Sequence, residues 1–132
     1  MSGDIEQRDL VSRLRAANER MRRLREDAES GDNVIRFRVE RHLQAAEETL
    51  RDLNVQATDA PAPGSYAGRL LERDLWRAES EIVFAEAKLE AARAEESHDV
   101  RGFANATHRA MSAQRSVLSA EIARDPQEHS PR

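Results

Sequence analysis

Apolar and small residues recur in the first part of the chain at alternating intervals of four and three positions. The repeat consists of Leu10, Leu14, Ala17, Met21, Leu24 and Ala28. An α-helix turns once every 3.6 residues, so this spacing brings the six side chains to one side of a helix, as in a coiled coil. A Ser-Gly-Asp-Asn segment then predicts a turn, with Gly31 left-handed and Asp32 or Asn33 capping the next helix.

The same repeat predicts a second helix over residues 34–53. Its apolar seam is Ile35, Val39, Leu43, Ala46, Leu50 and Leu53. At its start, Ile35, Phe37 and Val39 alternate with arginines, which is also the pattern of a β-strand. Helical spacing follows at once, so a helix is favoured over a strand.

A third and longer helix is predicted over residues 66–96, after a linker at 54–65 that contains two prolines and a glycine. Its seam is Leu71, Leu75, Ala78, Ile82, Ala85, Leu89 and Ala92. Trp76, Val83 and Phe84 lie beside the seam and make the apolar face wider than one neighbouring helix requires. We expect these three residues to form an interface with the other hairpin or with a second chain.

The fourth helix is predicted over residues 100–123 and carries apolar residues in two adjacent lines. One face has Val100, Ala104, Thr107, Met111, Leu118 and Ile122; the line beside it has Phe103, Ala110 and Val117. Its many Ala and Ser residues would let it approach a neighbour closely. Residues 124–132 contain two prolines and no apolar residue, which predicts a disordered tail.

Together these segments predict an all-α protein made of two antiparallel helical hairpins. The first hairpin covers residues 1–53 and the second covers 66–123, and the four helices form a coiled-coil-like bundle. In this arrangement Leu75 and Ile82 lie between the third and fourth helices. Dimerisation would cover any seam residues that a single chain leaves exposed, so we expect a homodimer or a larger homo-oligomer.

Composition supports long, exposed helices. Charged residues make up 35% of the chain and aromatic residues 4%, against about 25% charged in an ordinary globular domain. The chain has no cysteine, which excludes disulfides and thiolate metal sites. The start of the chain is polar, and no apolar run is long enough to span a bilayer. We therefore expect a cytoplasmic protein with no membrane partner.

The sequence offers no convincing catalytic or metal site. Glu95 and His98 have the Glu-x-x-His spacing of carboxylate-bridged metal bundles, but such a site needs a second pair and two further carboxylates. No nucleophile motif, phosphate-binding loop or zinc motif is present. We expect no catalytic residues, no metal and no cofactor, and hence no enzyme.

The most pronounced local feature is a cluster of arginines in the first hairpin. If its helices fold back on each other, the cluster comprises Arg20, Arg22, Arg23, Arg25, Arg36, Arg38 and Arg41. One interpretation is a docking surface for an acidic partner or for phosphates. The other is a set of solvated helix faces, with acids of the third helix as counter-charges.

The function that these observations predict is non-enzymatic. We expect a helical interaction protein, such as an adaptor, an assembly factor or an inhibitor, that acts on a protein partner through helix surfaces. The alternative is a nucleic-acid-binding protein that uses the arginine cluster. The net charge of −4 opposes the approach of a polyanion, so an acidic protein surface ranks above nucleic acid.

Overall fold

The protein consists of four α-helices joined by short connections. The computed structural model describes the backbone of residues 2–62 and 64–122, and the side chains of 9–62 and 64–120. The helices are α1 (Ser2–Glu29), α2 (Asn33–Thr58), α3 (Tyr66–Glu96) and α4 (Val100–Ile122). The predicted all-α fold class is confirmed. The tail predicted at 124–132 lies outside the described residues.

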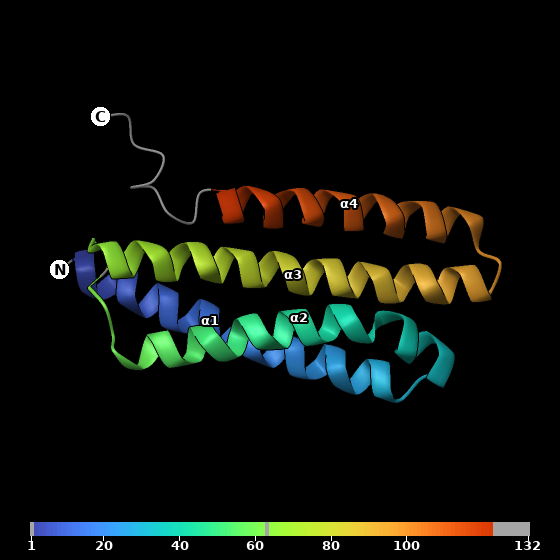
Figure 1. The fold of residues 1–132 in the computed structure, drawn as a ribbon, viewed down its shortest axis with the longest axis horizontal. Coiled ribbons are helices and arrows are strands. Elements are labelled where there is room, and N and C mark those ends of the chain that lie inside the picture. The colour runs from blue at the N-terminus through green and yellow to red at the C-terminus, as the bar shows by residue number, and fades with distance from the viewer. Residues whose placement is uncertain (1, 63, 123–132) are drawn as a thin grey trace.

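Consecutive helices run in opposite directions, and α3 lies between α4 and the pair formed by α1 and α2 (Figure 1). Within the described chain, α1, α2 and α3 all contact one another, whereas α4 contacts α3 and neither of the other two. The bundle is therefore a three-helix core with a fourth helix on the outer side of α3. The third helix joins the core of the first hairpin, in addition to pairing with its own hairpin partner.

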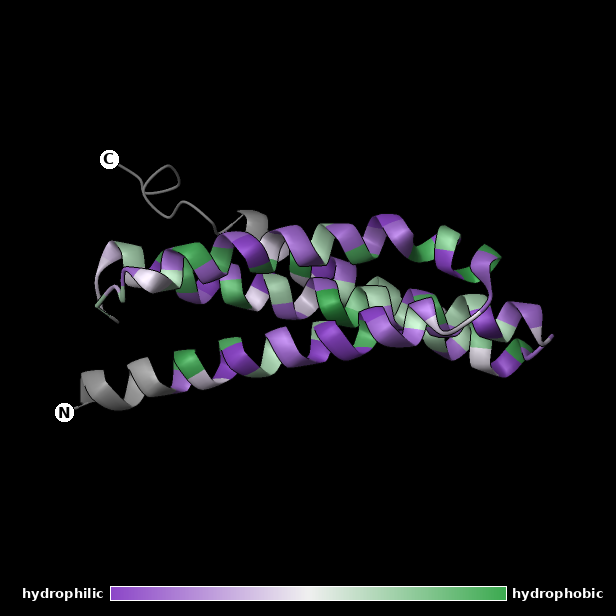
Figure 2. Cartoon of the chain, turned by 90° about the horizontal axis from the view of Figure 1, so that it is seen from below, coloured by the Kyte–Doolittle hydropathy of each residue, from purple (hydrophilic) through white to green (hydrophobic). Residues whose placement is uncertain are grey.

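The core is built from the three predicted seams, which recur as hydrophobic positions along otherwise hydrophilic helices (Figure 2). All the predicted seam residues of α2 and α3 are buried, as are those of α1 except Leu14, which is partly buried. Leu43, Leu53 and Ile82 are completely inaccessible to solvent. Leu75 and Ile82 belong to the cluster shared with α1 and α2, so their expected place between α3 and α4 was wrong.

Small side chains form the contact between α3 and α4. On α3 the buried residues outside the core seam include Ala87, Ala91 and Ala94, and on α4 they are Ala106, Ala110, Ala113 and Ala120. These four buried alanines of α4 are spaced four, three and seven residues apart, so they share one face. Methyl side chains allow two helix backbones to approach closely. The predicted close approach is thus made through alanine. The larger apolar residues Val100, Met111 and Leu118 lie outside this contact and are exposed.

The helix ends follow local side-chain chemistry. Asp32 caps α2, with its carboxylate accepting a hydrogen bond from the Val34 amide at 2.7 Å. Asp99 caps α4 in the same way, accepting from the Gly102 amide at 2.9 Å. Among the residues whose backbone is described, Ala60 (φ 45°) and His98 (φ 60°) are the left-handed ones, so the left-handed conformation expected at Gly31 was wrong. Helix α2 also continues to Thr58, beyond its predicted end at residue 53.

Candidate interaction surfaces

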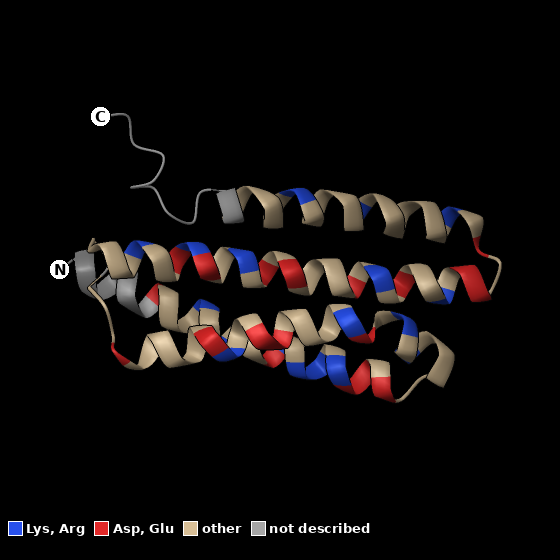
Figure 3. Cartoon of the chain, viewed as in Figure 1, with Lys and Arg blue, Asp and Glu red and all other residues tan. Residues whose placement is uncertain are grey.

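Charged residues of both signs alternate along α1, α2 and α3, whereas α4 carries basic residues alone between its first residue and its undescribed end (Figure 3). The chain therefore has two candidate binding surfaces. One is the arginine cluster predicted in the first hairpin. The other is the outward side of α4, which the sequence did not single out as a site.

Arg25, a central member of the arginine cluster, is used inside the chain. Its guanidinium lies between α1 and α2 and donates hydrogen bonds to Glu47 and Glu40, at 3.1 Å from Nε to Glu47 and 2.6 Å from Nη1 to Glu40. These carboxylates, Glu47 foremost, raise the pKa of Arg25 above its usual value. Nearby, Asn18 and Asn54 exchange two side-chain hydrogen bonds, at 2.9 and 3.0 Å. These contacts fix how α1 and α2 align.

Three ion pairs connect α1 to α3, each with a sequence separation of 66. They are Arg13 with Glu79 at 2.6 Å, Arg20 with Glu86 at 2.5 Å, and Arg93 with Asp27 at 3.0 Å. A sequence separation that stays constant from pair to pair shows that α1 and α3 run parallel, because both helices then advance in the same direction. The pairs recur every seven residues beside the seam, where charged pairs of coiled coils set helix alignment. Arg20 is thus paired with an acid of α3, as expected if the acids of the third helix are the counter-charges of the cluster.

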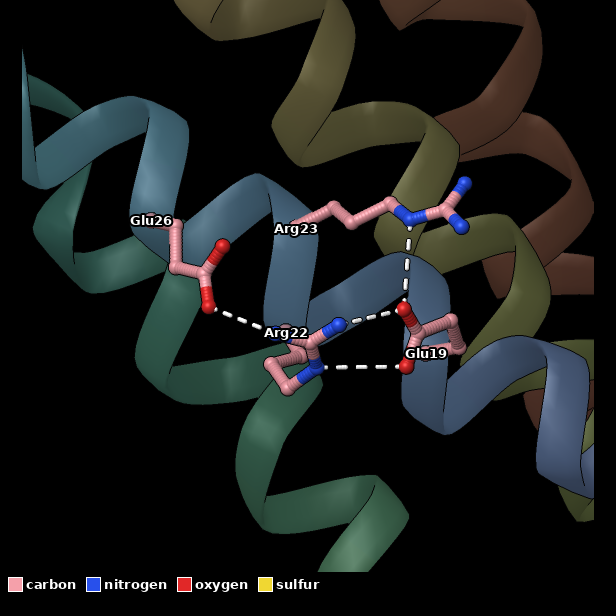
Figure 4. Close-up of polar contacts among 4 residues, drawn as sticks. All are labelled: Glu19, Arg22, Arg23 and Glu26. Atoms are coloured by element: carbon pink, nitrogen blue, oxygen red, sulfur yellow. Dashed lines mark hydrogen bonds and ion pairs between the residues drawn. The ribbon is translucent and has the colours of Figure 1, made fainter.

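Arg22 and Arg23 pair along their own helix (Figure 4). Arg22 lies between Glu19 and Glu26, with its Nε 3.1 Å from Glu19 and its Nη1 2.6 Å from Glu26. Arg23 reaches the same Glu19 at 3.2 Å. The hydrogen bond from Arg22 lowers the pKa of Glu19. These exposed pairs leave little uncompensated positive charge on this face of α1.

The arginines contributed by α2 are divided. Arg38 pairs with Glu95 of α3 at 2.6 Å. Glu95 is the carboxylate of the Glu95–His98 pair considered for metal binding, so this carboxylate already has a partner within the chain. Arg36 and Arg41 are exposed and have no ion-pair partner among the described residues. The predicted cluster is therefore mostly neutralised within the chain. Its role in binding an acidic protein or nucleic acid stays a prediction, with Arg36 and Arg41 as its unpaired members.

Of the residues predicted to form an interface, Trp76 and Val83 are seven residues apart and lie along one side of α3, whereas Phe84 faces α2. Phe84 packs against α2, where its ring and the His42 ring make a T-shaped contact with 4.9 Å between their centroids. The ammonium of Lys88 lies 5.5 Å from the centroid of the Phe84 ring. Val83 is half-buried and lines a groove between α1 and α4, and Trp76 remains 39% exposed. Because α3 has α1, α2 and α4 as neighbours, contacts within one chain account for much of its wide apolar face.

The outward side of α4 exposes large apolar residues. Val100 is 81% exposed, Met111 51% and Leu118 52%, and Phe103, which lies in the adjacent line with Ala110 and Val117, is 40% exposed. Arg109 is nine residues from both Val100 and Leu118, which at 100° per residue places it on the opposite face of the helix. Arg109 pairs with Glu90 of α3. The line from Val100 to Leu118 therefore points away from that contact, with no described residue of another helix covering it.

A basic edge runs beside this apolar face. It consists of Arg101, His108 and Arg115, which are seven residues apart, exposed, and without an ion-pair partner among the described residues. No acidic residue occurs from Val100 to Ala120. The periodicity of α4 was visible in the sequence, but periodicity does not tell which of two apolar lines is covered. Only the alanine contact with α3 makes that distinction.

Among the described residues, no group of three or more His, Asp and Glu side chains could hold a metal ion. A small apolar pocket lies where Leu10 of α1, Leu53 of α2 and Leu71 of α3 meet, and its lining has no nucleophile or titratable group. None of the helices in the described part of the chain combines the length and apolar character needed to cross a membrane.

Comparison with known proteins gives no relative from which a role could be transferred. No family model, no curated protein and no solved structure matches the chain.

Proposed function

We propose that the protein is a non-enzymatic helical interaction protein that binds a protein partner through the outward face of α4. The observation that carries this proposal is the exposure of Val100, Met111 and Leu118 in one line of a well-formed helix. Apolar side chains aligned at heptad spacing along one exposed helix face are the pattern with which a helix packs against a partner helix. A helix that packs on one neighbour through alanine, and turns its larger side chains to water, is suited to receive a second neighbour.

The energetics favour an external partner. Complete burial of a Val, Leu, Met or Phe side chain contributes about 1.5–3 kcal/mol, and four such residues on α4 are 40–81% exposed. Covering them within one chain would require α4 to contact α1 or α2, which it does not. Most arginines of the cluster, in contrast, are already paired with carboxylates of the same chain. The α4 face therefore ranks above the cluster as the binding surface.

The proposal is tested by comparing two double variants as baits in extract of the native host. Met111→Asp with Leu118→Asp places charge on the α4 face. Val34→Asp with Val55→Asp is the matched control, because these residues of α2 are 64% and 66% exposed. We expect quantitative mass spectrometry to show a partner that the control retains and the α4 variant loses. Equal retention by both variants, or turnover by the purified protein, would contradict the proposal.

A further inference from the structure

We infer that the partner segment recognised by α4 is an acidic amphipathic helix, with carboxylates beside its own apolar seam. This inference rests on the proposed function and specifies the chemistry of the partner. It combines three observations: the spacing of the exposed apolar residues, the unpaired basic edge beside them, and the absence of acids along the described α4 side chains.

The spacing identifies a helix as the complementary shape. Val100, Ala104, Thr107 and Met111 follow the four-three-four repeat of a coiled-coil seam, and Leu118 continues it seven residues later. At 1.5 Å per residue the line from Val100 to Leu118 is about 27 Å long. A partner helix of three heptads would cover it. The small side chains of Ala104 and Thr107 leave room for larger seam residues from that helix.

The charges identify the partner helix as acidic. Arg101 and Arg115 lie fourteen residues apart along one border of the seam, where coiled coils form interhelical ion pairs, and the imidazole of His108 lies on the same line midway between them. On the other border, Ala110 is buried and Val117 is half-buried. Arginines on α1 and α3 are mostly matched by carboxylates of the same chain, whereas Arg101 and Arg115 have none among the described residues. Carboxylates at heptad spacing on a partner would complete this pattern.

Pairing of α4 with α4 of a second copy fits this surface less well. An antiparallel pair would bring the basic border of one helix against the same border of the other, and like charges would repel. In a parallel pair the basic residues would meet Phe103, Ala110 and Val117 instead of carboxylates. An anionic membrane is also disfavoured, since the chain as a whole carries a net charge of −4.

Two model peptides test the inference. Both have three heptads with a leucine and alanine seam; one carries Glu at the positions beside the seam, and its twin carries Lys. Fluorescence anisotropy would measure their dissociation constants for the intact protein at about 50 and 150 mM salt. Exposed ion pairs are individually weak, so we expect the Glu peptide to bind about tenfold more tightly than its twin. The difference should shrink at the higher salt.

Two charge-reversal variants locate the binding site. Arg101→Glu with Arg115→Glu should reverse the preference to the Lys peptide. Arg36→Glu with Arg41→Glu is the matched control, because it reverses two exposed, unpaired arginines on α2, and should leave the preference unchanged. Circular dichroism would show that each variant keeps its helices.

The remaining outcomes overturn the inference in distinguishable ways. If both peptides bind equally and Met111→Asp with Leu118→Asp abolishes binding, the acidic chemistry is wrong but the proposed function stands. If neither peptide binds, the inference fails, and the host-extract experiment decides the proposed function separately. A preference reversed by the α2 variant instead would place the site on the arginine cluster. Tighter binding to anionic phospholipid vesicles, or a dimer dissociated by Met111→Asp, would replace the partner helix by a membrane or a second copy.

Discussion

His98 ends α3 in the left-handed conformation, at φ 60°. The amide that follows it donates a hydrogen bond to the carbonyl of Ala94 at 2.8 Å, a closure that favours glycine at this position. A side chain with a Cβ costs roughly 1–2 kcal/mol in this conformation. His98→Gly should therefore stabilise the protein by about 1 kcal/mol in urea unfolding. Ser97→Gly, at φ −88°, is the control and should not stabilise; a loss of stability in His98→Gly would contradict the assignment.

His42 makes stability depend on pH. Partial burial against α3 lowers its pKa, and the nearby charges of Arg41 and Lys88 lower it further. An unfolded histidine titrates near pH 6.5. Below about pH 6.5 the unfolded chain binds a proton at His42 more readily than the folded protein does. The free energy of unfolding therefore has its full value above this pH and falls as the pH decreases through it.

The expected result is a lower melting temperature at about pH 5.5 than at pH 7.5, a window above the titration of ordinary carboxylates. His42→Gln should reduce this decrease. His108→Gln, which leaves His42 in place, should retain it. A decrease of the same size in His42→Gln and the unaltered protein would show that another group is responsible.

At the level of single helices, α4 depends on one neighbour. Ala110 is 3% exposed and packs in the alanine contact with α3, while the adjacent Met111 is 51% exposed. Ala110→Leu would overpack that contact at a cost of about 1–3 kcal/mol. Because α4 contacts α3 alone, we expect faster amide hydrogen exchange in α4 and little change in α1 and α2. Met111→Leu should leave exchange unchanged, and uniform acceleration across all helices by Ala110→Leu would contradict this packing.

The sequence determined the helices better than it determined their contacts. Four-three spacing identified the core seams because Leu, Ile and Ala at that spacing all fall on one side of a helix, which must then be the buried side. It could not assign α4, where an alanine line and a line of larger residues lie side by side. Nor could it pair Arg20 with Glu86, since that contact depends on α1 and α3 being parallel neighbours. Arginine clusters in a sequence carry no information on which carboxylates will meet them.

For the whole molecule, the predicted homo-oligomer is testable by light scattering. The prediction came from the wide apolar face around Trp76, Val83 and Phe84. The three neighbours of α3 account for much of that width, so the exposed part of Trp76 is the main surface left for a second copy on that side. A homodimer at micromolar concentration would scatter with twice the 14.9 kDa mass of the chain. A mass of 14.9 kDa throughout that range would contradict it.

The proposed binding surface requires that α4 keeps an apolar face open to solvent. The chain has no cysteine, so a single introduced thiol reports accessibility at one site. We would measure thiol-labelling rates in dilute protein for Met111→Cys, for buried Ala110→Cys, and for Phe37→Cys, at a residue that is 83% exposed. Met111→Cys should react nearly as fast as Phe37→Cys and far faster than Ala110→Cys. A Met111→Cys rate as slow as that of Ala110→Cys would mean that the face is covered and that α4 offers no free apolar surface to a partner.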